Sequence, residues 1–208
     1  IVGIACGFTV YASDSHRMAN CVKQACPEAL IVFGGAHSTI APEVVLRDVN
    51  VNLVVRGEGE MTLLEIVKCI KEGKPYTHIA GTVVRDDAQN VRYNEPRELI
   101  SDLDELPFPA RHLLPMERDF EFQKKGKLLY RYYLRKPMAN IVTSRGCPFN
   151  CVFCAVRTIL GRTWRGRSAE NVVEEIKFLV NEYGIKEFTP WDDSISLKKE
   201  RMIKICQA

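Results

Sequence analysis

Three cysteines lie within eight residues of this chain, in the run Cys-Pro-Phe-Asn-Cys-Val-Phe-Cys. Cys147, Cys151 and Cys154 have the spacing C-x3-C-x2-C, so a single tight loop supplies three thiolates. An iron–sulfur cube has four irons, and clusters that only carry electrons are closed by a fourth cysteine. Three protein thiolates leave one iron open to a small-molecule ligand. The spacing therefore predicts a 4Fe-4S cluster that takes part in catalysis.

The same thiolates could instead hold a structural zinc ion, which needs four ligands. The fourth ligand would have to come from a distant residue, such as Cys206, Cys6 or one of the four histidines. Zinc sites of this type usually contain a second C-x2-C pair, and none follows Cys154. We favour the open cluster, and a non-enzymatic zinc-binding module is an alternative function.

The residues between the cysteines carry a resemblance to a known family. The stretch from Cys147 to Cys154, with the aromatic Phe153 immediately before the last cysteine, resembles the signature loop of the radical S-adenosylmethionine (radical SAM) superfamily. The resemblance implies that SAM binds the open iron through its amino and carboxylate groups. One electron from an external flavodoxin- or ferredoxin-type donor would then split SAM and give a 5′-deoxyadenosyl radical. Phe153 would lie near the adenine of SAM, although a plain core residue is an equally good account of it.

Composition narrows the class of protein. The chain has 208 residues, of which 46% are hydrophobic and 26% charged, as is usual for globular proteins. A net charge of +3 does not indicate binding to nucleic acid, and no apolar run is long enough to span a membrane. The other cysteines are scattered along apolar segments rather than arranged as a disulfide framework. We therefore expect a cytoplasmic protein, because an oxygen-labile cluster requires a reducing compartment.

The first third of the chain alternates strand-like and helix-like segments. Residues 1–6, 29–35 and 51–57 are continuous apolar runs, the pattern of strands buried on both faces. Three helices are expected among them: one capped by Ser13, one at 42–47, and one that stops at Gly73. The expected buried stripes are Met18, Cys21, Val22 and Ala25 in the first helix, and Leu63, Ile66, Val67 and Ile70 in the third. Alternation of this kind predicts an α/β fold with a Rossmann-like parallel sheet.

All three predicted strands end in glycine or small polar residues, at 7–9, 34–37 and 57–60. Ligands of open parallel sheets bind beyond the carboxyl ends of the strands, where glycine lets a ligand approach the backbone. Each glycine alone could simply make a strand-to-helix turn. Three together at one edge favour a ligand site.

Three segments resemble the cobalamin-binding branch of the radical SAM enzymes: Phe-Gly-Gly-Ala-His at 33–37, Val-Arg-Gly-Glu-Gly-Glu at 55–60, and Leu-Asp-Glu-Leu-Pro-Phe-Pro-Ala-Arg at 103–111. In that branch the Gly-Gly pair lines the slot for the nucleotide tail of the cofactor. The resemblance implies that cobalamin is bound by residues at the strand ends, namely Thr9, Gly34, Gly35, Gly57 and Glu58.

Two departures from the branch are visible. Ala36 replaces the usual proline, and the Asp-x-His-x-x-Gly motif that supplies a cobalt ligand would lie before Ile1. We expect His37 to be a loop histidine with satisfied hydrogen bonds rather than a cobalt ligand. The alternative is a radical SAM enzyme whose sheet domain has lost cobalamin and serves as a substrate or partner module.

The remainder of the chain predicts a connector and a second domain. Thr82–Arg85 and Val91–Tyr93 form a predicted hairpin, 95–115 is a proline-punctuated connector, and 118–136 is a packed linker. A strand at 139–144 runs into the cysteine loop; a helix from Ser168 to Gly184 and a strand at 185–190 follow. The expected buried stripe of that helix is Val172, Ile176, Leu179, Val180 and Tyr183.

These elements match the opening of the partial (β/α)6 barrel of radical SAM proteins, in which chemistry lies at the carboxyl ends of the strands. We therefore expect a partial cobalamin-binding domain at 1–80, the hairpin and connector at 81–137, and the start of the barrel at 138–208. Asp192 and Asp193 lie on the same rim as the cysteine loop. Asp192 could bind the amino group of SAM or a substrate hydroxyl, or it could cap a helix that begins near Ser196.

Together, these features predict a radical SAM enzyme that uses a 4Fe-4S cluster, SAM and cobalamin to modify an unactivated carbon, by methyl transfer or cyclisation. The substrate would be a small molecule, lipid, tetrapyrrole or peptide. The chain begins with Ile1 in a predicted strand and stops at Ala208 in a helical pattern. We therefore expect a fragment of a longer protein that is inactive alone.

Overall fold

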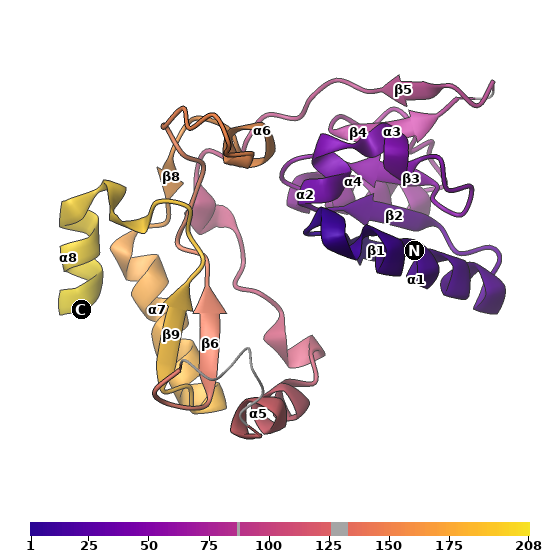
Figure 1. Ribbon diagram of the computed structural model, residues 1–208. Helices are drawn as coiled ribbons and strands as arrows, with labels where there is room; N and C mark the ends of the chain where they lie inside the picture. Colours follow the sequence, from indigo (N-terminus) through magenta and orange to yellow (C-terminus); the bar gives the residue numbers. More distant parts are fainter. Residues whose placement is uncertain (87, 126–132) are drawn as a thin grey trace. The chain divides into compact units, whose positions relative to one another are not determined.

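The computed structural model describes residues 1–86, 88–125 and 133–208 (Figure 1). The chain divides into two compact units, Ile1–Ile100 with Asn150–Gly161, and Ser101–Phe149 with Arg162–Ala208. The predicted hairpin therefore lies in the first unit, although we expected it in a separate connector. Asp87 of the predicted hairpin turn and residues 126–132 of the predicted linker lie outside the described residues.

The first unit is built on a sheet of five strands in the order β1-β2-β3-β4-β5. The first three strands are parallel, as predicted, and the hairpin is confirmed as β4 and β5. β4 also pairs antiparallel with β3, which the sequence did not predict. Val83 and Val84 of β4 are both buried, so the hairpin completes the core of the sheet. The strands are β1 (Val2–Ala5), β2 (Ile31–Gly34), β3 (Leu53–Val55), β4 (Thr82–Arg85) and β5 (Val91–Tyr93).

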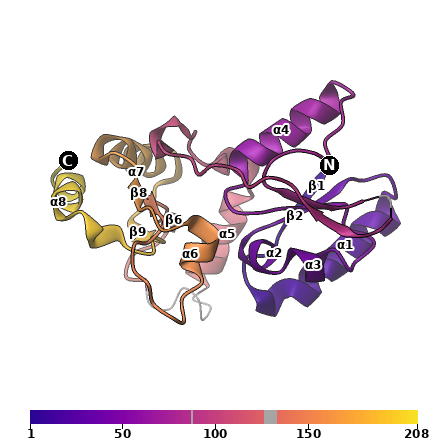
Figure 2. The same cartoon turned by 90° about the horizontal axis from the view of Figure 1, so that it is seen from above.

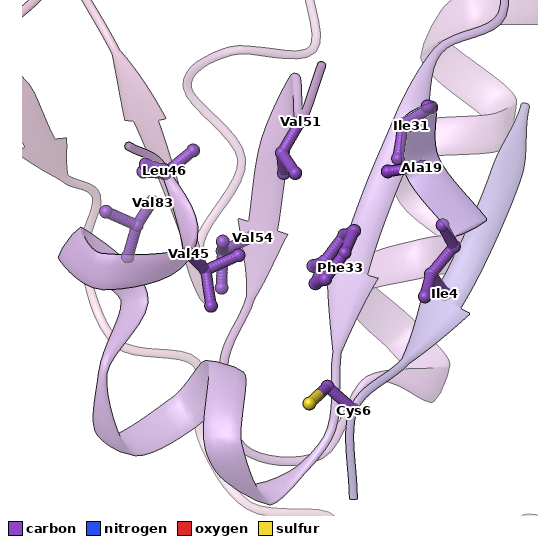
Figure 3. Packing of buried hydrophobic residues seen from close by; sticks show 10 residues of the cluster. All are labelled: Ile4, Cys6, Ala19, Ile31, Phe33, Val45, Leu46, Val51, Val54 and Val83. Atoms are coloured by element: carbon purple, nitrogen blue, oxygen red, sulfur yellow. The ribbon is translucent and has the colours of Figure 1, made fainter. Parts of the chain in front are cut away.

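Helices cover both faces of this sheet, with α4 on one face and α1, α2 and α3 on the other (Figure 2). Successive residues of a strand point to opposite faces. Phe33 therefore packs with Ile4 and Val54 in the cluster beneath α1 and α3 (Figure 3), while Val32 packs with Ile66 of α4. The helices are α1 (Ala12–Ala25), α2 (Ala36–Ile40), α3 (Pro42–Val45) and α4 (Glu60–Lys71), and the 3-10 turn η1 (Thr9–Tyr11) precedes α1.

Helix α1 differs from the sequence prediction in its start and in its buried face. Ser13 lies inside the helix rather than at its cap, and the buried residues are Ser15 and Ala19. Met18 and Cys21, which we expected to be buried, are exposed. The hydroxyl of Ser15 donates to a main-chain carbonyl one turn earlier, so this polar side chain is satisfied inside the fold.

The second unit contains a parallel pair of strands joined by α7, which agrees with the predicted opening of a barrel. Both predicted ends of α7 are confirmed: the Ser168 hydroxyl accepts from the amide of Asn171 at 3.1 Å, and Gly184 has a left-handed φ of 62°. Leu179 is buried against the strands, whereas Val180 of the expected stripe is exposed. The pair consists of β6 (Met138–Ile141) and β9 (Glu187–Pro190), and α7 spans Ala169–Tyr183.

Short elements complete the second unit and the cysteine loop. The helix predicted to begin at 196 or 197 begins instead at Lys199, after the 3-10 turn Ile195–Leu197. None of the helices in the described residues is both long enough and apolar enough to cross a membrane. The elements are η2 (Leu103–Glu105), η3 (Arg111–Leu113), α5 (Met116–Lys124), β7 (Ser144–Arg145), α6 (Val156–Leu160), β8 (Arg165–Gly166) and α8 (Lys199–Gln207).

Candidate functional site

The cysteine loop connects β7 to α6 and presents three free thiols. Cys147 and Cys154 are half-buried and Cys151 is exposed; none of the three forms a disulfide. Within the described residues, no three His, Cys, Asp or Glu side chains are gathered so as to hold a metal ion. The donor set nevertheless fits an iron–sulfur cluster, because three unpaired thiols are available on one short loop.

Phe153 is 88% exposed. The interpretation of this residue as part of the core is therefore wrong. Its predicted position beside the adenine of SAM stays a prediction. Phe149 and Val152 of the same loop are also exposed, at 57% and 95%, so the loop offers apolar surface next to its thiols.

Asp192 joins the end of β9 to the chain that leads into the cysteine loop. Its Oδ1 accepts from the amide of Thr143 at 2.7 Å, and its Oδ2 accepts from the hydroxyls of Thr143 and Ser144 at 2.6 and 2.5 Å. The alternative role of Asp192 as a helix cap is wrong, because no side chain in the described part of the chain caps α8 or the turn before it. Asp193 is exposed, and partial desolvation, followed by the charge of Asp192, raises the pKa of its carboxyl.

The carboxyl ends of β1, β2 and β3 meet at one edge of the first sheet, where side chains link the strand ends. Nδ1 of His37 lies 3.1 Å from the hydroxyl of Thr9, and its amide donates to Cys6. The hydroxyl of Thr39 donates to the carbonyl of Gly35 and accepts from the amide of Gly57, both at 3.0 Å. Thr39 was not predicted as a site residue, because its partners lie on two different strand ends.

His37 is only partly satisfied, which corrects the expectation from sequence. The residue is 7% exposed, and its Nε2 is buried and has no hydrogen-bond partner among the described residues. Glu58, which was predicted to bind cobalamin, is buried and bonded to the main chain. It is 8% exposed, and its Oε2 accepts from the amide of Ile100 at 2.8 Å, so this carboxylate fastens the chain that follows the hairpin.

A cavity of about 310 Å³ lies against β1 and β2, on the side of the sheet that α4 covers. Gly3 and Gly34 line it, and a Cβ added at either position would meet no atom of residues 1–86, 88–125 or 133–208 within 4 Å. Gly3 of β1 and Gly34 of β2 thus carry no side chain on this face, which leaves a slot beside the backbone at these two positions. Leu63 of α4, which was expected to be buried in the core, lines the slot and is 39% exposed. The slot leaves the backbone of both strands open to a ligand.

The two predicted glycines at the end of β2 have different roles. Gly34 opens space, whereas Gly35 has a φ of 96°, and a Cβ there would lie 2.8 Å from the carbonyl oxygen of Cys6. Gly35 is therefore required for close packing of β1 and β2. Thr9 and Gly57 lie at the strand ends without lining the slot.

The second half of the cysteine loop belongs to the first unit. Helix α6, which follows Cys154 in the chain, packs against α2 at the edge described above. The main-chain oxygen of Ile159 lies 3.8 Å from the position that a Cβ of Gly57 would take. The structure thus brings the segment with Cys151 and Cys154 to the edge that carries the glycine-rich strand ends.

Two family models match the chain, one over the glycine-rich strand ends and the other over the cysteine loop. The model described as the B12 binding domain matches residues 1–67, and that described as the Radical SAM superfamily matches residues 141–203. An uncharacterized methyltransferase of Pyrococcus horikoshii is 39% identical over 99% of this chain and 42% of its own length. The cytidylyl-2-hydroxyethylphosphonate methyltransferase of Streptomyces wedmorensis is 32% identical over 94% of this chain and 40% of its own length. The chain thus spans about two fifths of these relatives.

Solved structures agree on the fold. The radical S-adenosylmethionine methyltransferase TsrM from Kitasatospora setae superposes with a TM-score of 0.74 at 18% identity, over 99% of this chain and 39% of that one. The cobalamin-dependent S-adenosylmethionine radical enzyme OxsB gives a TM-score of 0.75 at 22% identity, over 100% of this chain and 28% of that one. With a B12 binding domain followed by a radical SAM domain, the chain belongs to the radical SAM proteins that carry a cobalamin-binding domain.

Proposed function

We propose that this chain binds a 4Fe-4S cluster through Cys147, Cys151 and Cys154, SAM at the open iron, and cobalamin at the glycine-rich edge of the first sheet. In the whole enzyme these cofactors would serve to methylate an unactivated carbon. The observation that carries the proposal is the loop of three free thiols, whose second half packs at the same sheet edge as the strand-end glycines.

The residues of the chain would hold and orient the cofactors. When bound, the cluster with SAM supplies abstraction of a hydrogen atom from carbon, and cobalamin supplies a transferable methyl group. Three thiolates would hold three irons and leave the fourth for SAM. The absence of a side chain at Gly34 would let a planar part of cobalamin lie against the strands. Asp192 would keep the entry to the cysteine loop in place through its bonds to Thr143.

Methyl transfer is favoured over cyclisation by the names of the relatives. Those that are 39% and 32% identical are called methyltransferases, whereas the anaerobic magnesium-protoporphyrin IX monomethyl ester cyclases of Synechocystis and Cereibacter sphaeroides are 26% and 29% identical. We propose an organic substrate with an unactivated carbon, and an electron donor of the flavodoxin or ferredoxin type. The eight cysteines all lie in the described residues and all are free, which supports a reducing compartment such as the cytoplasm.

Anaerobic reconstitution with iron and sulfide tests the cluster. We expect about four irons and four sulfides per chain, and an electron paramagnetic resonance (EPR) signal of the reduced cluster that changes when SAM is added. Cys151→Ala should abolish this loading, whereas the matched control Cys21→Ala, on the exposed face of α1, should retain it. Zinc without iron or sulfide in anaerobically purified protein would contradict the proposal.

Binding of hydroxocobalamin tests the second cofactor. After gel filtration the chain should retain the corrin absorbance, and Gly34→Val should reduce it because the side chain fills the slot. Ala88→Val, in the exposed turn between β4 and β5, is the control for introducing a valine outside the slot. Equal loss of corrin from both variants would contradict the assignment of the slot. No corrin retained by the unmodified chain would instead indicate a partner or substrate module.

A further inference from the structure

A single carboxylate is buried near the middle of α7. Glu175 is 1% exposed, and each of its oxygens meets an arginine from a different segment. Oε1 accepts from Nη1 of Arg111 at 2.7 Å, and Oε2 accepts from Nη1 of Arg167. Arg111 comes from the connector, and Arg167 follows β8. The side chains of both arginines are about nine-tenths buried, at 10% and 11% exposure.

Both arginines also donate to the main chain at the carboxyl end of β6. Nη2 of Arg111 donates to the carbonyl of Asn140 at 3.1 Å, and Nη1 of Arg167 donates to the carbonyl of Val142 at 3.0 Å. Val142 lies two residues before β7, where the cysteine loop begins. The carboxylate therefore acts on the entry to the loop without touching the loop.

The exit of the loop is held by the same arginine. The amide of Arg167 donates to the carbonyl of Thr143 at 2.9 Å, and its Nε donates to Asn171 of α7 at 2.6 Å. Just beyond Thr143, β7 and β8 pair antiparallel, so the two ends of the cysteine loop leave the fold side by side. The two ends of the cysteine loop are thus held together by the β7–β8 pair and by the hydrogen bonds of Arg167.

The charge of Glu175 holds the two buried arginines in these positions. Two guanidinium groups can be buried here because they share one carboxylate and pass their remaining donors to carbonyl oxygens. The contacts are satisfied together only when the end of β6 and the start of α7 keep their positions. Neutralising Glu175 would leave both arginines without their counter-charge and free them to move toward water.

We propose that Glu175 is a positioning residue for the cysteine loop, which it acts on through Arg111 and Arg167 at the base of the loop. The inference rests on the proposed function, since it concerns the residues that hold the cluster ligands. Residues that orient metal ligands from outside the ligand shell typically change metal affinity about 10- to 100-fold when they are mutated.

The test compares Glu175→Gln with Leu179→Ala in the 208-residue chain. Leu179 lies one turn further along α7 and is fully buried in the core of the second unit, where its apolar side chain can form no hydrogen bond with either arginine. After anaerobic reconstitution, Glu175→Gln should release iron to a chelator about 10-fold faster than the unmodified chain. It should also show faster amide exchange at 142–145 and 165–167, and an altered EPR line shape of the reduced cluster. Leu179→Ala should lower the melting temperature while changing none of these three readouts.

Three results would overturn the inference. Unchanged iron release and exchange in Glu175→Gln would do so while leaving the proposed function intact. The inference would also be overturned if Leu179→Ala released iron and exchanged amides as fast as Glu175→Gln at the same loss of stability. An unmodified chain that takes up no iron or sulfide would remove the proposed function and this inference with it. If Glu175→Gln does not fold, Arg111→Lys takes its place, because lysine keeps the charge but lacks the two separate donor nitrogens with which Arg111 reaches Glu175 and Asn140.

Discussion

Gly34 and Gly35 are adjacent at the end of β2, yet an added methyl group should destabilise the protein at Gly35 and have little effect at Gly34. At Gly35 the backbone has a φ of 96° and a ψ of −177°, a region that residues with a Cβ essentially never adopt. The added Cβ would also lie 2.8 Å from the carbonyl oxygen and 2.9 Å from the carbonyl carbon of Cys6. These are main-chain atoms of the residue that directly follows β1.

The strand cannot move aside without losing bonds. The amide of Cys6 donates to Gly34 at 2.8 Å, and the carbonyl of Cys6 accepts from the amide of His37 at 3.1 Å. The disfavoured backbone alone costs about 1–3 kcal/mol, and the contact with Cys6 adds to it. We therefore expect Gly35→Ala to lower the free energy of unfolding of the first unit by about 3 kcal/mol, near the upper end for single substitutions. Gly34→Ala meets open space and should change stability by less than about 0.5 kcal/mol.

Urea unfolding separates the two variants. With a slope of about 1–3 kcal/mol per molar, the far-UV circular dichroism midpoint of the first unit should fall by about 1–3 M in Gly35→Ala and stay unchanged in Gly34→Ala. Both tryptophans, Trp164 and Trp191, lie in the second unit, so their fluorescence is an internal control that should not shift. Equal midpoints for the two variants would refute the argument from backbone geometry.

Three further substitutions test the second unit. Asp192→Asn removes an acceptor that serves the buried Thr143 and Ser144, so thermal unfolding followed by tryptophan fluorescence should show a loss of about 1–2 kcal/mol; an unchanged melting temperature would exclude this role. Desolvation and the charge of Asp192 raise the pKa of Asp193, so its favourable contribution is present below the ordinary pKa of 3.8 and is lost as the pH rises through the raised pKa. Asp193→Asn should therefore gain stability relative to the unmodified chain in urea at pH 7 but not at pH 3, and a gain confined to pH 3 would reverse the sign. Ser168→Ala removes the cap of α7 and should lower stability by about 1 kcal/mol in the same thermal assay, whereas no loss would show that the cap bond is not stabilising.

The elements whose signals come from residues close together in the sequence could be predicted. The cysteine loop is recognised by spacing alone, and α7 by a serine cap and a terminal glycine, because each signal acts within one or two turns of backbone. The parallel strands of the first unit follow from their apolar runs. Helix α1 shows the limit of this approach: its buried residues are small or polar, so the hydrophobic pattern selected the wrong face.

The local pattern of this chain determined which segments are strands and helices, and where three thiols sit on one loop. Only the tertiary structure decided which distant groups meet. Asp192 reaches Thr143 across 49 residues, and Glu175 reaches Arg111 across 64, because α7 and β9 fold back onto β6. The slot beside Gly3 and Gly34 exists because two separate strands pair in register and each places one glycine on the same face. Such pairings depend on packing between segments that share no sequence signal, which is why the geometry of the site had to come from the fold.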